Sequence, residues 1–440
     1  MSGGSGEDEH PLLTDLYQLT MLQSYWRRGM REPATFELFV RHLPQNRRFL
    51  VSCGLAEALE YLKALRFATE SIDRLRSLER FDASFLDWLA TLRFTGEMWA
   101  IPEGEIFFAA EPLLRITAPL PEAQLVETYL LNAVLYSTGV ASKAARVAIA
   151  AAGRDVVDFS ARRDHGTDAA LKAARASWIA GFSGTSNVLA GLRFGIPLFG
   201  TMAHSYVMAF DREEDAFRAY AEEFPETTVL LVDTYDTEQG IRRAAQVGRE
   251  LAARGKTLRG VRLDSGDVVA EARLARRVLD DAGLQATTIF ASGDLNEWRV
   301  DDIVRTGAPV DGFGVGTELG VVADAPALPG VYKLAEYAAR PRAKRSPEKQ
   351  TLGGRKQVWR RADGSDVLTR DDEQVDGARP LLERVMSDGR TETSDGLPEM
   401  RRRCAGALAA LPAGLRDLSP CPPGSGRAVE ISAALAGGSG

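Results

Sequence analysis

The stretch Thr228-Val-Leu-Leu-Val-Asp-Thr234 is the first of four similar phrases, each an apolar run that ends in small or acidic residues. The first three runs are followed by an amphipathic segment of helical length. The other phrases are Leu258-Arg-Gly-Val-Arg-Leu-Asp-Ser-Gly-Asp267, Thr287-Thr-Ile-Phe-Ala-Ser-Gly-Asp294 and Asp311-Gly-Phe-Gly-Val-Gly-Thr-Glu318. Apolar strands that alternate with helices are typical of βαβ units, so the sequence predicts a parallel sheet.

An acidic residue stands near the end of each run: Asp233, Asp264, Asp294 and Glu318. Because each falls where a strand passes into a helix, we expect all four to lie at the carboxyl end of the sheet. That end is where α/β barrels and open α/β sheets bind their ligands. The pattern therefore predicts an enzyme.

Similar strand-to-helix patterns begin near residue 123 and predict an α/β barrel-like catalytic domain over 123–334, with six or seven junctions. Residues 12–122 mix helical and alternating patterns, which predicts an N-terminal α+β domain. We expect 335–421 to form a C-terminal segment that packs on the N-terminal domain. Residues 1–11 are expected to be a disordered lead-in and 422–440 a flexible tail.

The bulk composition is that of a globular protein: 440 residues, 45% hydrophobic and 26% charged, with a net charge of −7. The negative charge gives no reason to expect a nucleic-acid partner. No apolar stretch reaches the roughly 18 residues of a membrane span, and the N-terminus has no signal-peptide pattern. Three cysteines without metal-ligand spacing favour reduced thiols in a cytoplasm.

The last two junctions suit a phosphate group. Glycines at Gly293, Gly314 and Gly316, with Thr317, leave backbone N–H groups unobstructed ahead of a helix, whose dipole favours an anion. Asp264 and Asp294 suit sugar hydroxyls or Mg²⁺. Arg162 and Arg262 can offer paired donors to phosphate or carboxylate. Together these residue types predict a phosphorylated sugar bound with a metal ion.

His204 lies between a Gly-Thr turn and a helical pattern, and is one of only four histidines. A neutral imidazole there can act as a base, or as a nucleophile while a carboxylate orients its other nitrogen. Asp233, at the end of the next strand, is the expected carboxylate. A structural or solvated histidine is the alternative.

Seven segments in order over residues 12–360 resemble the nicotinate phosphoribosyltransferases: Thr14-Asp-Leu-Tyr-Gln18, Gly184-Thr-Ser-Asn187, Gly200-Thr-Met-Ala-His-Ser205, Arg262-Leu-Asp-Ser-Gly-Asp267, Ser292-Gly-Asp-Leu-Asn296, Gly314-Val-Gly-Thr-Glu-Leu319 and Gly354-Arg-Lys-Gln-Val358. Such enzymes join nicotinate to phosphoribosyl pyrophosphate, giving nicotinate mononucleotide and pyrophosphate, in NAD biosynthesis. ATP hydrolysis is coupled to the reaction, and Mg²⁺ is expected. The resemblance implies an irregular α/β barrel plus an α+β domain formed from both chain ends, in a homodimer with shared active sites.

The resemblance also implies roles for single residues. His204 is similar to the histidine that ATP phosphorylates, and Asp233 to its orienting partner. Phe159 and a Tyr17 of the neighbouring subunit resemble the two faces of a slot for the pyridine ring. The remaining matches are to contacts with substrate phosphate and carboxylate (Arg162, Arg262), with ribose (Asp264, Asp294) and with the 5′-phosphate (Gly293, Gly314, Gly316).

Two alternatives stay open. A nicotinamide-using relative would have an aspartate in the Gly-Thr motif, where this chain has Ser186, whose hydroxyl can donate to a carboxylate. A catalytically silent binding dimer on the same fold would not need His204.

Overall fold

The computed structural model describes residues 6–346, 350–392 and 395–437. The chain forms two compact units. One unit combines Met1–Gly139 with Ala327–Gly440, and the other is Val140–Pro326. The prediction that both chain ends build one α+β domain, and that the middle of the chain forms a barrel-like domain, is confirmed.

The second unit is built on a six-stranded parallel sheet with the order β7-β6-β11-β10-β9-β8. Thr185 of the first strand in this order also forms a parallel bridge with Leu198. The four phrases of the sequence correspond to the last four strands in chain order. The bounds are β6 (Asp155–Asp158), β7 (Gly184–Thr185), β8 (Val229–Leu231), β9 (Gly260–Leu263), β10 (Thr288–Ala291) and β11 (Gly312–Val315).

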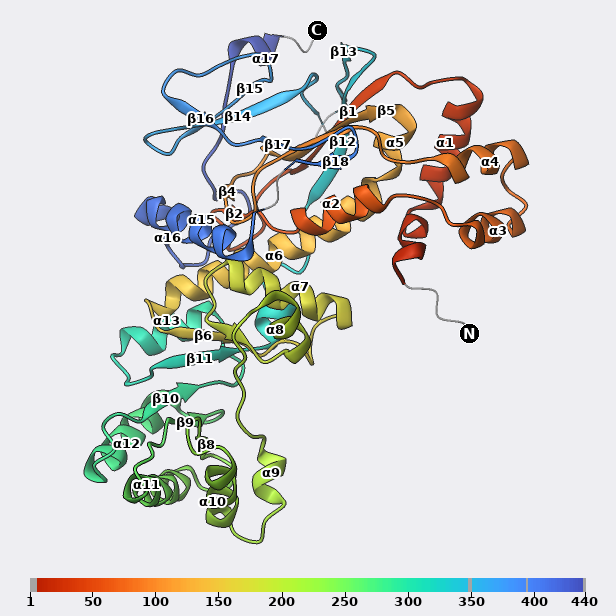
Figure 1. Cartoon of the computed structure of the whole chain (residues 1–440). Helices are drawn as coiled ribbons and strands as arrows, with labels where there is room; N and C mark the ends of the chain where they lie inside the picture. The colour runs from red at the N-terminus through yellow and green to blue at the C-terminus, as the bar shows by residue number, and fades with distance from the viewer. Residues whose placement is uncertain (1–5, 347–349, 393–394, 438–440) are drawn as a thin grey trace. The chain divides into compact units, whose positions relative to one another are not determined.

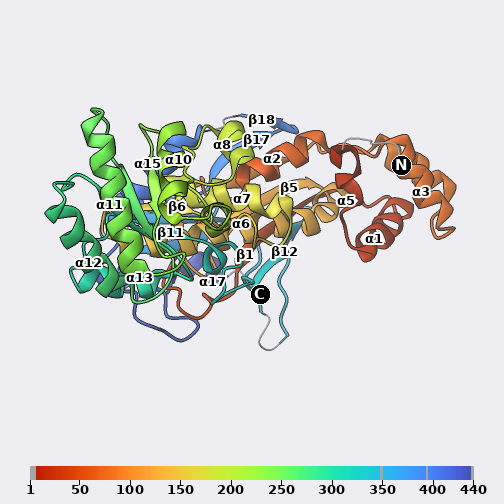
Figure 2. The same cartoon turned by 90° about the horizontal axis from the view of Figure 1, so that it is seen from below.

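Helices follow the strands of this unit, and α10, α11 and α12 pack next to one another outside β8, β9 and β10 (Figure 1, and from below in Figure 2). Gly240 of α11 lets this helix approach the sheet closely, because a Cβ atom there would lie 1.9 Å from the carbonyl oxygen of Val232. The bounds are α6 (Glu127–Ala151, which runs across the division between the units), α7 (Thr167–Ile179), α8 (Val188–Phe194), α9 (His204–Met208), α10 (Glu213–Glu223), α11 (Thr237–Ala253), α12 (Val268–Asp281), α13 (Glu297–Arg305) and α14 (Thr317–Gly320).

Side-chain caps fix the starts of helices that follow strands, among them α11, α12 and α13. Asp236 accepts from the Gln239 N–H at 2.8 Å, Asp267 from the Ala270 N–H at 3.1 Å, and Asn296 from the Arg299 N–H at 3.1 Å. Each cap satisfies an N–H group that has no partner within its helix. The loops at the carboxyl end of the sheet are therefore held by their own helices.

The first unit contains a seven-stranded sheet with the order β13-β12-β1-β5-β3-β17-β18, and smaller sheets with the orders β16-β14-β15-β19 and β2-β4. Strands from the C-terminal part of the chain pair with N-terminal ones, β12 with β1 and β17 with β3. The strand bounds are β1 (Pro33–Val40), β2 (Leu50–Val51), β3 (Glu97–Ala100), β4 (Ile106–Phe107), β5 (Pro112–Pro119), β12 (Gly330–Tyr337), β13 (Arg340–Pro341), β14 (Lys356–Arg361), β15 (Asp366–Arg370), β16 (Ala378–Pro380), β17 (Glu383–Ser387), β18 (Arg390–Thr391) and β19 (Glu430–Ile431).

The helices of the first unit supply one side of its apolar core, which includes Leu19, Leu22, Phe85 and Leu89. Their bounds are η1 (Gly6–Leu12, a 3₁₀-helix), α1 (Leu16–Arg27), α2 (Leu55–Ala64), α3 (Thr69–Ser77), α4 (Ala83–Thr91), α5 (Leu120–Leu125), α15 (Leu397–Ala410), α16 (Ala413–Arg416) and α17 (Ala433–Gly437).

The observed division differs in detail from the expected domain bounds. It falls after Gly139 and after Pro326, rather than after 122 and 334. Residues 6–11 of the expected disordered lead-in belong to the 3₁₀-helix η1, while residues 1–5 lie outside the described part. The expected flexible tail contains β19, which pairs with β15, and α17, whose Leu435 is only 1% exposed.

Candidate active site

The candidate site lies in the second unit, where the strands end and the helices begin. Asp233 follows β8, and its Oδ2 accepts hydrogen bonds from the Asp264 N–H at 3.0 Å and the Ser265 hydroxyl at 2.6 Å. Its other oxygen is buried without a hydrogen-bond partner. Asp233 thus holds the loop between β9 and α12.

Arg262, on β9, is largely buried and directs its guanidinium across neighbouring elements. Its Nε donates to the Ser292 hydroxyl at 3.0 Å, and one Nη donates to the Thr201 hydroxyl at 3.2 Å and to the Met202 carbonyl at 3.3 Å. The other Nη donates to Asp264 at 3.1 Å. These bonds fix a cation among the strand ends.

Asp264 is held as a carboxylate by the same network. Burial raises the pKa of Asp264, but the hydrogen bond from Ser292 and the positive charge of Arg262 outweigh burial, so the pKa lies below its ordinary value. An ionised, hydrogen-bonded carboxylate is well suited to accept from sugar hydroxyls.

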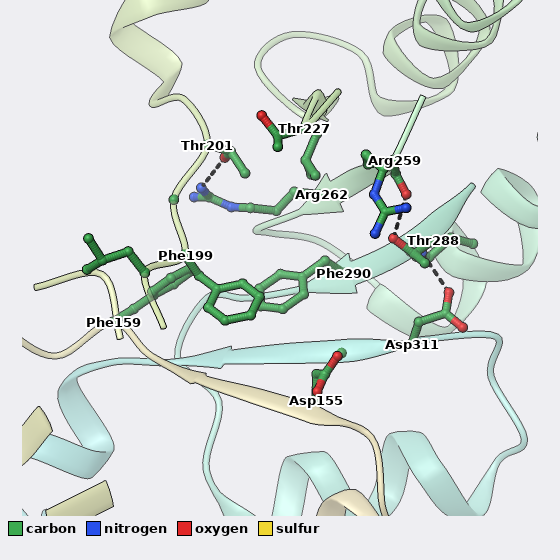
Figure 3. A pocket seen from close by; sticks show the side chains of 15 residues that line it. Asp155, Phe159, Phe199, Thr201, Thr227, Arg259, Arg262, Thr288, Phe290 and Asp311 are labelled. Carbon is green, nitrogen blue, oxygen red and sulfur yellow. Dashed lines mark hydrogen bonds between the residues drawn. The ribbon is translucent and has the colours of Figure 1, made fainter. Parts of the chain in front are cut away.

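A pocket of about 360 Å³ opens beside this network (Figure 3). Phe159, Phe199 and Phe290 provide aromatic walls, with Phe159 and Phe290 5.9 Å apart between ring centroids. The guanidinium carbon of Arg262 lies 5.8 Å from the centre of the Phe159 ring. The rest of the lining includes residues at or near the beginnings of strands, namely Asp155, Arg259, Thr288 and Asp311. The pocket can therefore receive a flat ring and offer its substituent a positive charge.

His204, the first residue of α9, has its side chain 39% exposed. Its Nδ1 lies 3.2 Å from the Thr234 hydroxyl, and its Nε2 lies 3.6 Å from Oδ2 of Asp264. The expected pairing of His204 with Asp233 is wrong for this structure, because the described hydrogen bonds of Asp233 go to Asp264 and Ser265. The carboxylate nearest to the ring belongs to Asp264, and Thr234, which the sequence analysis missed, contacts the other nitrogen.

Two glycine turns lie after β10 and β11. Gly293 has φ +89°, and a Cβ atom there would lie 1.9 Å from the Asp264 carbonyl oxygen, so the turn requires glycine. Asp294 is also left-handed, with φ +46°. At Gly314 a Cβ atom would lie 2.5 Å from the Phe159 ring, and at Gly316 it would lie 3.2 Å from the Phe159 carbonyl oxygen. Both glycines therefore let the chain pass close to Phe159, and Thr317, which follows Gly316, is exposed.

The loop after β6 is organised by two carboxyl groups. Asp158 is fully buried and accepts from Ser160 and Thr185, and burial raises its pKa despite these bonds. Burial, and then the charge of Asp158, raise the pKa of Asp164 to about 6. Arg162, in this loop, is exposed, and so is Ser186, whose N–H donates to the Asp158 carbonyl.

Tyr17 lies on α1 of the first unit, with 49% of its surface exposed. Its expected role, in a slot shared with a neighbouring subunit, stays a prediction. The sequence analysis also missed Phe199, Phe290 and Arg259 of the pocket. Phe290 had a sequence signal, since it stands two residues before Ser292 at the end of a predicted strand. In the structure it pairs in register with Arg262.

Within the described residues, no group of three or more His, Cys, Asp or Glu side chains is arranged to hold a metal ion. Mg²⁺ does not require one, because it is commonly bound by one or two carboxylates together with substrate phosphates. The unpartnered buried oxygen of Asp233, whose other oxygen accepts from the Asp264 N–H, is a fitting ligand. A search of the helices in the described part of the chain finds none with the length and apolar character needed to cross a membrane.

Comparisons with known proteins agree over most of the chain. Residues 12–135 match the model of the nicotinate phosphoribosyltransferase N-terminal domain, and residues 155–322 that of the nicotinate phosphoribosyltransferase family. Nicotinate phosphoribosyltransferase pncB2 of Mycobacterium tuberculosis is 47% identical over 416 residues, which cover 92% of this chain and 89% of the relative.

Two further relatives extend the agreement. Nicotinate phosphoribosyltransferase of Bacillus subtilis is 42% identical over 392 residues, which cover 86% of this chain and 80% of the relative. The crystal structure of human nicotinic acid phosphoribosyltransferase superimposes with a TM-score of 0.86 at 29% identity, covering 96% of this chain and 98% of the human one.

Proposed function

The chain belongs to the nicotinate phosphoribosyltransferase family of enzymes, and we propose that it joins nicotinate to phosphoribosyl pyrophosphate, giving nicotinate mononucleotide and pyrophosphate. One observation carries the proposal: two residues of the aromatic pocket reach the glycine turns at the carboxyl end of the parallel sheet, Phe159 beside Gly316 and Arg262 through its hydrogen bond to Ser292. A ring acid and a sugar phosphate would bind side by side there.

The aromatic half of the site would hold the pyridine ring. Phe159, which lines the pocket, would offer a ring face, and Arg262 would supply a positive charge for the carboxylate. Arg262 is already committed to hydrogen bonds, so its contribution to nicotinate is mainly the charge. Arg162, which is exposed, would supply free donors to a phosphate or carboxylate group.

The polar half of the site would hold the phosphoribosyl group. The turns at Gly293 and Gly316 would offer backbone N–H groups to the 5′-phosphate, with Thr317 directly after Gly316. Asp264 and Asp294 would accept from the ribose hydroxyls. The pyridine nitrogen attacks the anomeric carbon with its lone pair, and pyrophosphate leaves with the bonding electrons. The transition state resembles an oxocarbenium ion, so the site needs positioning and charge placement more than a strong base.

His204 would couple the reaction to ATP as a phosphorylated histidine. Its imidazole is partly exposed, and the Thr234 hydroxyl and the Asp264 carboxylate limit how it can turn. A phosphoryl group on this ring would add negative charge and acceptor oxygens beside Asp264, at the carboxyl end of the sheet. Mg²⁺, held by Asp233 and Asp264 together with substrate phosphates, would neutralise part of that charge.

We place this enzyme in the cytoplasm, in NAD biosynthesis, and infer a homodimer. The three cysteines are buried free thiols, which fits a reducing compartment. Helix α8 exposes Val188, Leu189 and Leu192, and an exposed apolar row of this kind is typical of an interface between protein chains. A partner subunit would bring Tyr17 to the open face of the pyridine site.

Labelled nicotinate and nicotinamide, each supplied with phosphoribosyl pyrophosphate, test the proposal directly. We expect mononucleotide from nicotinate and much less from nicotinamide, because the ring site carries positive charge and Ser186 offers a hydroxyl. Product mainly from nicotinamide would favour the amide-using alternative. No product from either ring would favour a silent binding protein.

A further inference from the structure

A buried ionic cluster lies in the second unit, outside the proposed substrate contacts. Lys143 of α6 is fully buried, and its Nζ lies 2.6 Å from Oε2 of Glu297 and 2.9 Å from Oδ1 of Asp324. The Nε of Arg146 donates to the other oxygen of Glu297 at 3.0 Å. The Trp298 ring centre lies 5.0 Å from the Lys143 Nζ and 5.7 Å from the Arg146 guanidinium carbon.

The cluster contributes little to net stability, because removing several charges from water offsets most of their mutual attraction. The role of the cluster must therefore lie in fixing the positions of the segments that contribute its side chains. An aliphatic replacement of similar volume would fill the same position without that cost of desolvation. The burial of Lys143 therefore indicates that its charge holds the neighbouring segments in a defined arrangement.

Two carboxylates of the cluster stand directly after the two glycine turns. Glu297 is the first residue of α13 and follows Asp294 by three positions. Glu318 is the second residue of α14 and follows Gly316 by two positions, with its Oε2 4.0 Å from the Lys143 Nζ. One ammonium group therefore lies between the starts of two helices whose preceding turns would bind phosphate.

We propose that Lys143, with Arg146 and Glu297, positions the two glycine turns for the phosphate groups of phosphoribosyl pyrophosphate. These are positioning residues, since they reach the substrate only through the turns. The inference rests on the proposed function and assigns its phosphate-binding geometry to α6. Without the ammonium, the carboxylates of Glu297 and Asp324 lose a charge partner inside the protein, and α13 and α14 shift to relieve the imbalance.

Steady-state kinetics of Lys143→Met and Asp324→Asn test this positioning role. Lys256→Met is the matched control, because Lys256 forms an exposed ion pair with Glu226. In Lys143→Met we expect KM for phosphoribosyl pyrophosphate to rise about tenfold or more, since misplacing a binding group by 1 Å can cost about a hundredfold. KM for nicotinate should stay near its wild-type value. Asp324→Asn should give a smaller rise of the same kind, and Lys256→Met none.

A purely structural role would instead lower the folded, active fraction and leave both KM values unchanged. Thermal unfolding of each variant measures that fraction. Equal KM for phosphoribosyl pyrophosphate in wild type and folded Lys143→Met would overturn the inference while leaving the proposed function intact. If Lys143→Met does not fold, an unchanged KM in Asp324→Asn overturns it. Calorimetric titration of the wild type with phosphoribosyl pyrophosphate distinguishes failure of the positioning role from failure of the proposed function. If the wild type neither binds phosphoribosyl pyrophosphate nor forms product, the proposed function itself is wrong.

Discussion

Replacing Gly314 by alanine should displace the Phe159 ring and weaken nicotinate binding. A Cβ atom at this position would lie 2.5 and 2.6 Å from two carbons of the Phe159 ring and 3.1 Å from a carbon of the Phe290 ring. Since carbon atoms pack at about 3.5–4.0 Å, the Phe159 ring must retreat by roughly 1 Å. The ring is only partly buried and can move, whereas the backbone of a central strand cannot follow easily.

The size of the effect on nicotinate binding depends on whether the Phe159 ring or the strand backbone moves. Overpacking of this kind costs about 1–3 kcal/mol, and movement of an exposed ring should keep the loss of unfolding free energy near the lower limit. A binding loss of about 1.4 kcal/mol corresponds to a tenfold change in affinity. We therefore expect KM for nicotinate to rise about tenfold, with KM for phosphoribosyl pyrophosphate less affected.

Gly312→Ala is the matched control for this substitution. It lies on the same strand two positions earlier, and its Cβ would meet the Phe290 ring at 3.0 Å and the Asp155 carbonyl oxygen at 3.2 Å. These contacts require shifts of only a few tenths of an ångström, so the control should raise KM for nicotinate much less than Gly314→Ala does. A wild-type KM for nicotinate in folded Gly314→Ala would refute the assignment of Phe159 to the pyridine ring.

Three further predictions concern charge and burial. Ser186→Asp should raise KM for nicotinate about tenfold or more, because a carboxylate repels the negatively charged substrate. The same substitution should improve the use of nicotinamide relative to nicotinate. Unchanged selectivity between the two rings would show that Ser186 does not belong to the ring site. The raised pKa of Asp164, about 6, means that the folded state binds more protons than the unfolded state between about pH 4 and pH 6, so Tm should fall as pH rises through this window. Asp164→Asn should flatten that decline, while exposed Asp168→Asn should leave it unchanged. Burial raises the pKa of Cys404 to about 12, so the native protein should react with thiol reagents far more slowly than the urea-unfolded chain, and rapid native labelling would contradict the burial.

The parallel sheet could be predicted from the sequence because its strands are short apolar runs between strongly amphipathic helices. Such periodicity indicates directly which face of each element is buried. The β8–β11 region therefore appears where the four phrases stand, and its acidic residues lie at the expected strand ends. Short strands with little periodicity were less predictable. The segment 422–437 forms β19 and α17 through contacts with distant β15, which no local pattern indicates.

The partners of single side chains at the site could not be predicted in the same way. Asp233 and His204 were both correctly expected at the carboxyl end, but which carboxylate faces the imidazole depends on loop paths and rotamers. Asp264 takes that position, while Oδ2 of Asp233 accepts from Asp264 and Ser265 in the loop after β9. Likewise, nothing local to Lys143 predicts its burial, because its counter-charges come from residues more than 150 positions away.

Formation of labelled nicotinate mononucleotide from nicotinate and phosphoribosyl pyrophosphate, with and without ATP, in wild type and His204→Ala, tests the central claim most directly. We predict product with wild type, stimulation by ATP, and phosphate from labelled ATP retained on the wild-type protein. In His204→Ala both the stimulation and the retained label should be lost while a basal rate remains. Absence of product from wild type would contradict the proposed reaction, and ATP stimulation that survives in His204→Ala would contradict the role of this histidine.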